Sequence, residues 1–268
     1  MGDCGKCDIK SVCTKSGLCA AKSGYALTDK VLVSGGTFSM GCTQWNDTLC
    51  EKDTIVRHVA YISSFYMDTY EVSQGKFKAC VTAGKCTAPA GGYASSSDAS
   101  PMVKPTWAMA SAYCSFVGGD LPTESQWEFA ARTIDGGVAT TVYAWGNSWP
   151  PPSLAAIGNT GISELADPYP YYHDANKCEE INALGVCNMA GNVSEWVRDY
   201  YTPNGFPNTL TVKDPVISTP IATTNRVFRG SNWYYSLISE PAPYRRFTYD
   251  PAATYTNIGM RCAYPFVN

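Results

Sequence analysis

The sequence has little charge, almost no histidine and no long apolar run. Charged residues make up 16% of its 268 residues, the net charge is −3, and histidine occurs twice. Because no basic block or stripe is present, nucleic acid is not an expected partner. No apolar stretch approaches the roughly 18 residues of a membrane-spanning helix, and no secretory leader is visible. The chain is expected to be globular, with any surface anchor supplied by an N-terminal signal outside this sequence.

Cysteine, in contrast, is abundant. Its number is even, and three pairs lie close together in sequence: Cys42/Cys50, Cys80/Cys86 and Cys178/Cys187. This pattern favours disulfides and therefore an extracellular, periplasmic or cell-surface location. The alternative is a zinc site made by the first four cysteines, although their spacing is loose for such a site. The residues expected in disulfides are Cys4, Cys7, Cys13, Cys19, Cys42, Cys50, Cys80, Cys86, Cys114, Cys178, Cys187 and Cys262.

The pattern of the chain predicts an α+β, loop-rich fold. A Cys-rich segment, 1–25, precedes one domain, 26–268. Helices are predicted at 74–84, 106–118 and 123–132, with caps at Ser73, Thr106 and Thr123. Thr123 and Gln126 form a capping-box pattern. Strands are predicted at 31–33, 37–40 and 57–73, and shorter ones at 192–201, 226–232 and 259–264.

Several sequence blocks occur in an order that is typical of one family. They read "GGTFSMGC", "PTWAMASAYCSFVGGDLPTESQWEFAAR", "GVCNMAGNVSEWVRDYY", "RVFRGSNW" and "NIGMRCAY". Together they resemble the domain of the formylglycine-generating enzyme, or sulfatase-modifying factor, family from about Val31 to Tyr264. The resemblance implies an elaborated C-type lectin-like fold. It also implies a disulfide between Cys114 and Cys262, which would constrain the unfolded chain by roughly 4–5 kcal/mol.

The catalytic groups of that family have no counterpart in this sequence. Its enzymes oxidise a substrate cysteine with a copper(I)-binding cysteine pair, and the matching positions here are about Tyr235 and Ser239–Glu240. A second branch uses iron held by three histidines, whereas this chain has only His58 and His173, which we interpret as ordinary surface or loop residues. The sequence thus predicts no catalytic residues, no copper and no iron.

A structural calcium ion is implied by the same resemblance. In the "NMAGNVSEW" block the matching ligands are Asn188, Gly191, Val193 and Glu195. The glycine and the valine would contribute backbone carbonyls, because Ca²⁺ prefers oxygen ligands. The alternative is that Asn188 and Glu195 only hydrogen-bond the turn.

Tyrosines occupy the region in which the family has its redox cysteines. Tyrosine supplies rigid contact area at low entropic cost, as in antibody paratopes. We therefore predict a non-catalytic recognition protein whose C-terminal face binds a protein or glycan ligand. This tyrosine face consists of Trp233, Tyr234, Tyr235, Ser236, Ser239, Tyr244, Arg245, Tyr249, Tyr255 and Asn257.

A further hypothesis concerns the origin of that face. Gly230, Trp233, Arg246, Gly259 and Arg261 match the family, while many residues between them are reachable from asparagine codons by changing adenines. Proteins diversified by diversity-generating retroelements have this pattern. The alternatives are an oxidase that acts on cysteine through an unrecognised site and a structural module of a surface assembly.

Overall fold

The computed structural model describes most of the predicted domain. The described residues are 11–13, 19–21, 29–42, 58–132, 134–135, 138–139, 141–147, 182–203, 205–206, 212–233 and 242–266. The helices are α1 (Gln74–Thr82), α2 (Trp107–Phe116) and α3 (Glu124–Ala131). The strands are β1 (Ser11–Cys13), β2 (Cys19–Ala21), β3 (Lys30–Val33), β4 (Gly36–Met40), β5 (His58–Ile62), β6 (Phe65–Asp68), β7 (Ile134–Asp135), β8 (Val138–Ala139), β9 (Ser194–Tyr200), β10 (Val212–Lys213), β11 (Arg226–Arg229), β12 (Phe247–Tyr249), β13 (Ile258–Gly259) and β14 (Ala263–Pro265).

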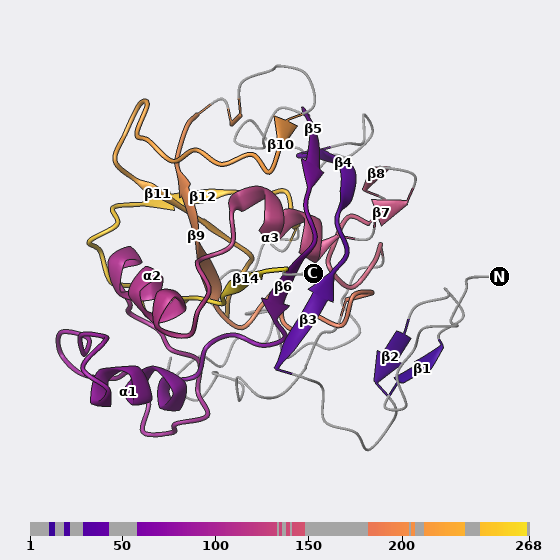
Figure 1. Ribbon diagram of the computed structural model, residues 1–268. Helices are drawn as coiled ribbons and strands as arrows, with labels where there is room; N and C mark the ends of the chain where they lie inside the picture. The colour runs from indigo at the N-terminus through magenta and orange to yellow at the C-terminus, as the bar shows by residue number, and fades with distance from the viewer. Residues whose placement is uncertain are drawn as a thin grey trace, which may run out of the picture.

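Short strands form three main sheets, and α3 lies among them while α1 and α2 lie at the periphery (Figure 1). One sheet has the order β14-β6-β3, the second β10-β5-β4 and the third β12-β11-β9-β13. Most neighbouring strands are antiparallel, while β10 runs parallel to β5 and β13 parallel to β9. The C-terminal strand β14 pairs with β6, so the end of the domain lies beside its beginning. The α+β class predicted from the sequence is confirmed.

Helix α3 lies at the centre of the molecule (Figure 1). It contacts β4, β5, β9 and β11, and nearly all of its residues are buried. Trp127 and Phe129 join the larger hydrophobic cluster together with Phe38 and Met67. Since α3 connects two sheets, its polar residues are also placed in the interior.

A second hydrophobic cluster joins α1 and α2 to the four-stranded sheet. Its members include Trp196 and Phe228, whose rings meet edge to face at 5.8 Å. The disulfide between Cys114 of α2 and Cys262 lies within this cluster and spans 148 residues. The predicted link between these two cysteines is therefore confirmed.

Four other cysteines are also oxidised. Cys80 is bonded to Cys86 at the end of α1, as predicted. Cys42 and Cys187 are disulfide-bonded as well. Their predicted partners, Cys50 and Cys178, lie outside the described residues, as do Cys4 and Cys7. Nothing is described of the side chains of Cys13 and Cys19, so the pairing of the N-terminal segment stays a prediction.

The three predicted helix caps are present. The side chains of Ser73, Thr106 and Thr123 each accept a hydrogen bond from the backbone N–H three residues later. The capping box of Thr123 and Gln126 is complete, because the glutamine side chain also accepts from the Thr123 N–H. Local hydrogen bonding thus fixes where each helix starts, independently of the tertiary fold.

Two sequence predictions need correction. The long strand predicted at 57–73 is divided by Ser63 and Ser64 into β5 and β6, which belong to different sheets. His58 is not a surface residue: its side chain is buried in β5, and its ring lies 5.0 Å from that of Phe206.

None of the helices in the described part of the chain is long and apolar enough to span a membrane.

Candidate functional site

The described members of the tyrosine face differ in exposure. Trp233 is buried, and it packs with Val103 and Val193 in a small hydrophobic cluster below the end of β11. Its backbone N–H donates to the carbonyl oxygen of Asn192 at 3.0 Å. Trp233 therefore anchors the segment that follows it. Four predicted face residues, Tyr234, Tyr235, Ser236 and Ser239, lie outside the described residues.

Tyr244 is also buried rather than displayed. None of its side chain reaches solvent, and its ring lies 5.5 Å from the guanidinium carbon of Arg132. A ligand cannot contact this side chain without a rearrangement of the interior. The structure therefore removes Tyr244 from the predicted face and places it in the support beneath it.

Tyr249 and Tyr255 are the described tyrosines of the face that remain accessible. Both are half-buried, and their rings stack at 4.2 Å with an angle of 20° between the planes. Tyr249 also stacks on Phe228 at 5.1 Å, so the pair is continuous with the core. Such packing orders the rings before any ligand arrives, which lowers the entropic cost of binding. Arg245 and Asn257 are half-buried as well.

Backbone hydrogen bonds hold the loop that carries Tyr255. The carbonyl oxygen of Tyr255 accepts from the N–H of Lys104 at 3.0 Å. The carbonyl oxygen of Asn257 accepts from the N–H of Ser194 at 2.9 Å, next to the parallel pairing of β13 with β9. The described part of the face is thus fixed to two neighbouring segments.

A buried network of ion pairs supports the entry and the middle of the tyrosine segment, defined here as residues 233–257. Arg229, just before it, pairs with Glu124 at 3.1 Å and with Glu128 at 2.8 Å. Arg246, within it, donates to both oxygens of Glu124 at 2.8 and 2.7 Å. All four side chains are almost completely buried. We call these four residues, with Arg132, the anchor network.

The anchor network also fixes the backbone of the segment directly. Arg229 Nη1 donates to the carbonyl oxygens of Pro243 and Arg245, both at 2.8 Å. Arg246 Nη1 donates to the carbonyl oxygen of Thr202 at 2.6 Å. Backbone acceptors do not depend on side-chain identity. The network can therefore hold the segment whatever side chains the exposed positions carry.

Asp199 adjoins this network at the start of α3. Its carboxylate accepts from the backbone N–H groups of Glu124 at 2.7 Å and Ile217 at 2.8 Å. Complete burial, together with the nearby Glu124 carboxylate, raises the pKa of Asp199 to about 7. The two backbone N–H groups and Arg246 act in the opposite direction. Sequence reasoning missed this residue, because nothing in its local pattern marks it.

The predicted calcium ligands do not all fit a cation equally. Glu195 is already occupied: both of its oxygens accept from Arg261 at 2.8 Å, and Oε2 also accepts from Trp127 at 2.7 Å. A divalent cation at this carboxylate would lie next to the positive charge of Arg261. The alternative interpretation, in which Glu195 serves only structural bonds, describes the arrangement seen here.

The rest of that loop does offer unsatisfied oxygen. Asn188 and Asn192 both have left-handed backbone, with φ of 58° and 61°. The buried side-chain amide of Asn192 has no hydrogen-bond partner among the described residues. Asn188 donates to Oε2 of the fully buried Glu71 at 3.0 Å, and Oε1 of Glu71 has no such partner. Buried groups of this kind ordinarily bind water or an ion. Buried oxygen atoms of Asn192 and Glu71 thus have no hydrogen-bond partner among the described residues.

No catalytic constellation is visible in the described part of the chain. Among those residues no group of three or more His, Cys, Asp and Glu side chains could hold a metal ion. Cys262, the cysteine nearest to the tyrosines, is bonded to Cys114. Glu124 and Glu128 are held in the anchor network.

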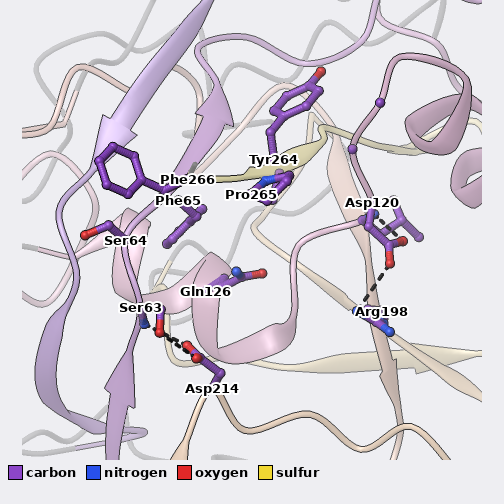
Figure 2. Close-up of a pocket in the computed structure, with 14 residues that line it drawn as sticks. Ser63, Ser64, Phe65, Asp120, Gln126, Arg198, Asp214, Tyr264, Pro265 and Phe266 are labelled. Carbon is purple, nitrogen blue, oxygen red and sulfur yellow. Dashed lines mark hydrogen bonds and ion pairs between the residues drawn. The ribbon is translucent and has the colours of Figure 1, made fainter. Parts of the chain in front are cut away.

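A pocket of about 520 Å³ lies elsewhere on the molecule, between the β5–β6 turn, β14 and the connection from α2 to α3 (Figure 2). It contains none of the predicted site residues. Its polar lining includes the side chains of Asp120, Gln126, Arg198 and Asp214. Phe65 and Phe266 contribute aromatic surface. Nothing in the sequence pattern indicated it, since its residues come from segments that are distant along the chain.

Together, the mixed sheets, the central helix and the disulfide across the core define an α+β domain of the C-type lectin-like class. The family described as "Sulfatase-modifying factor enzyme 1-like domain" matches residues 16–265, and the chain belongs to this family. The family predicted from the sequence blocks is thereby confirmed.

Curated relatives include active and inactive members. The formylglycine-generating enzyme of Streptomyces coelicolor is 32% identical over 174 residues, which cover 61% of this chain and 52% of that protein. The inactive C-alpha-formylglycine-generating enzyme 2 of Mus musculus is 31% identical over 169 residues, covering 61% and 48%. The chain thus spans about half the length of these relatives.

Two solved structures share the fold. PvdO from Pseudomonas aeruginosa superposes with a TM-score of 0.61 and 18% identity, covering 91% of this chain and 99% of that one. Treponema denticola variable protein 1 also has a TM-score of 0.61 and 18% identity, covering 87% and 94%. At this identity the likeness concerns the fold alone. The same fold therefore occurs in proteins that have different names.

Proposed function

We propose that the chain is a non-catalytic recognition protein whose tyrosine segment binds a protein ligand. The observation that carries the proposal is the anchor network, which fixes the entry and the middle of the segment through buried contacts. The chain is buried at Gly230 and Trp233, where the segment begins, and again at Arg246 within it. Tyr249 and Tyr255 stand half-exposed at its edge as a stacked pair. A rigid base with aromatic and small polar side chains above it is the arrangement of a paratope.

The chemistry of the sequence supports the non-catalytic part of this proposal. No cysteine occurs between Cys187 and Cys262, and both of these are in disulfides. A soft metal such as copper(I) prefers thiolate ligands, so the segment offers it no site of that kind. The disulfides favour action outside the reducing cytosol, in an extracellular, periplasmic or cell-surface setting.

A triple tyrosine variant and a single control variant test the recognition role. The triple variant Tyr234→Ala, Tyr235→Ala and Tyr255→Ala should lose binding in an array of purified cell-surface proteins, with little change in melting temperature. The control is Tyr61→Ala, which removes a tyrosine that is 41% exposed on β5. Unchanged array binding by the triple variant would exclude the tyrosine face. Stoichiometric copper binding by the reduced chain, with turnover of a cysteine peptide, would instead support an oxidase.

The diversification hypothesis extends the same proposal. A retroelement would need a scaffold that tolerates many side chains, and the backbone-directed bonds of Arg229 meet that need. The expected genomic arrangement is a reverse transcriptase gene beside a near-copy of the DNA that encodes the tyrosine segment. If the gene neighbourhood held neither the reverse transcriptase gene nor the near-copy, the diversification hypothesis would be excluded, and the protein would recognise one fixed ligand.

We also propose a structural calcium ion at the loop that begins with Asn188. Its oxygen ligands would be Asn188, the carbonyls of Gly191 and Val193, and the Glu71 carboxylate, while Glu195 stays paired with Arg261. When bound, Ca²⁺ would stabilise this loop beneath Trp233 and take no part in chemistry. Calcium should raise the melting temperature of the EGTA-treated protein, and Glu71→Gln should abolish the rise. A shift that survives Glu71→Gln would reassign the carboxylate, and no shift at all would remove the ion.

A further inference from the structure

The pocket of Figure 2 is separate from the tyrosine segment and does not depend on the function proposed for it. Its volume of about 520 Å³ falls in the range of roughly 300–1,000 Å³ that small-molecule sites occupy. The walls come from the β5–β6 turn, from residues 118–121 and from β14. These walls are tied together: the backbones of Asp120 and Ala263 exchange two hydrogen bonds, each of 2.9 Å. The pocket is therefore a built feature of the fold.

One hydrogen-bond donor in the pocket has no protein partner among the described residues. The Gln126 side chain is held by its Oε1, which accepts from the Thr123 N–H at 2.9 Å in the capping box. Its Nε2 makes no hydrogen bond with any described residue. Asp120 and Asp214 line the same pocket (Figure 2). The capping box thus presents an amide donor at a fixed position.

Two carboxylates also line the pocket, and each is oriented by the protein. Asp214 accepts from both the N–H and the hydroxyl of Ser63 at 2.7 Å. Asp120 accepts from the Leu121 N–H at 2.8 Å and pairs with Arg198 at 3.3 Å. An ionised carboxylate has about four acceptor positions, so both retain capacity for a ligand hydroxyl. Asp214 also has left-handed backbone, with φ of 47°.

The charges in the pocket disfavour an anionic ligand and are compatible with a neutral one. An anion would meet two carboxylates, and a strong cation would meet the Arg198 guanidinium that already pairs with Asp120. A ligand rich in hydroxyl groups avoids both conflicts, because each hydroxyl both donates and accepts. Planar carboxylate, amide and guanidinium groups suit neighbouring hydroxyls, since two parallel hydrogen bonds can form at each.

The pocket also has an aromatic wall for the apolar face of such a ligand. The Phe266 side chain is 38% exposed, and it lies beside Tyr66 with ring centroids 5.9 Å apart. Phe65 and Leu121 are buried at the base. The ring of a sugar combines hydroxyl edges with an apolar C–H face, so it matches both kinds of surface.

Addition of a peptide strand at this edge is disfavoured. The N–H and carbonyl of Ala263 are already used by Asp120. The next outward-facing residue of β14 is Pro265, which has no N–H to donate. An extended peptide could therefore not continue the sheet here.

We propose that this pocket binds a neutral saccharide. Gln126 Nε2 and Arg198 donate to its hydroxyl oxygens, Asp120 and Asp214 accept from its hydroxyls, and Phe266 packs against its C–H face. The site assigns the protein a carbohydrate-binding activity in addition to recognition by the tyrosine segment.

The test is saturation-transfer NMR of the full chain with methyl glucoside, methyl mannoside, methyl galactoside, N-acetylglucosamine and cellobiose. We expect at least one of these probes to bind. Gln126→Glu should weaken that probe tenfold or more, because it removes the amide donor and adds negative charge. Glutamate keeps the acceptor of the capping box, so α3 should remain intact. Phe266→Ala should weaken the same probe.

Two control variants establish whether the saccharide binds in this pocket or at another surface. Phe116→Ala removes a phenylalanine on α2 that is 42% exposed and does not line the pocket, and it should leave saccharide binding unchanged. Tyr255→Ala should also leave it unchanged, whatever it does to protein binding. Absence of a signal from all five probes would overturn the proposal. Equal binding by wild type, Gln126→Glu and Phe266→Ala would overturn it as well.

Discussion

Arg246 binds both oxygens of Glu124 in the interior, with distances of 2.8 Å from Nε and 2.7 Å from Nη2. The pair joins the residue just before β12 to the first residue of α3. Its third contact, to the Thr202 carbonyl, ties in the segment after β9. The middle of the tyrosine segment is thereby fixed to the central helix by charge-assisted bonds, which are short and directional.

Removal of this arginine should destabilise the fold strongly. Arg246→Met leaves the Glu124 carboxylate buried with only part of its bonding, and a broken buried pair costs about 3–5 kcal/mol of unfolding free energy. Urea denaturation measures the loss. Arg245→Met is the matched control, because Arg245 is the adjacent residue along the chain and is half-exposed. A substitution at such a position should change the free energy of unfolding by no more than about 0.5 kcal/mol. Similar losses for the two variants would contradict the role of the anchor network.

The entry to the tyrosine segment should be sensitive to a single added methyl group. Gly230 has φ of 78°, and a Cβ there would lie 3.1 Å from Trp127 and 3.2 Å from the Met189 carbonyl oxygen. Gly91 has nearly the same φ, 77°, but open space around it. Gly91→Ala should cost about 1 kcal/mol from backbone strain alone. Gly230→Ala should lower the free energy of unfolding clearly more than Gly91→Ala, as measured by thermal or urea denaturation. Equal losses would show that the close contacts with Trp127 and Met189 do not restrict the side chain at this position.

The sequence predicted the local features of this fold well. The three helix caps involve a side chain and a backbone group three residues apart, so the pattern contained all of their partners. The resemblance to the family supplied the Cys114–Cys262 pairing, which no local pattern reveals. In contrast, the division of 57–73 into β5 and β6 depends on a turn at Ser63, which Asp214 caps from 151 residues away. A distant partner of this kind is invisible to local reasoning.

The candidate site shows the same limit. The sequence places Glu124 and Glu128 in a predicted helix, but it does not reveal that their partners are Arg229, Arg132 and Arg246. Tyr244 was placed on the face by its composition, yet it is completely buried. A tyrosine has both an apolar ring and a polar end, so its sequence context does not decide between surface and interior.

The two described disulfides should contribute unequally to stability. On the chain-entropy model, closing the loop of Cys114 and Cys262, which are 148 residues apart, contributes roughly 5 kcal/mol. The bond between Cys80 and Cys86, which are 6 residues apart, contributes roughly 2 kcal/mol. Cys114→Ala with Cys262→Ala should therefore lower the denaturation midpoint much more than Cys80→Ala with Cys86→Ala. Equal losses would indicate that native-state packing, rather than loop closure, dominates.

Asp199 should make stability depend on pH in the opposite direction to an ordinary salt-bridged carboxylate. Burial, and secondarily the Glu124 charge, raise its pKa from an ordinary 3.8 to about 7 in the folded protein. Between about pH 4 and pH 7 the folded state therefore holds a proton that the unfolded state has lost. Stability falls wherever the folded state binds more protons as pH rises. The contribution of Asp199 is complete below about pH 4 and is lost as pH rises through 7.

Asp199→Asn isolates this contribution. Asparagine stays neutral, so the fall in unfolding free energy between pH 4 and pH 7 should become shallower than in the wild type. The variant should also be less stable by about 1–3 kcal/mol, because its NH₂ group cannot accept from one of the two backbone N–H groups that Asp199 satisfies. Arg246 must remain in place, since it also affects the pKa of Asp199. Urea titrations at each pH give the slope directly, and an unchanged slope in Asp199→Asn would assign the pH dependence to another group.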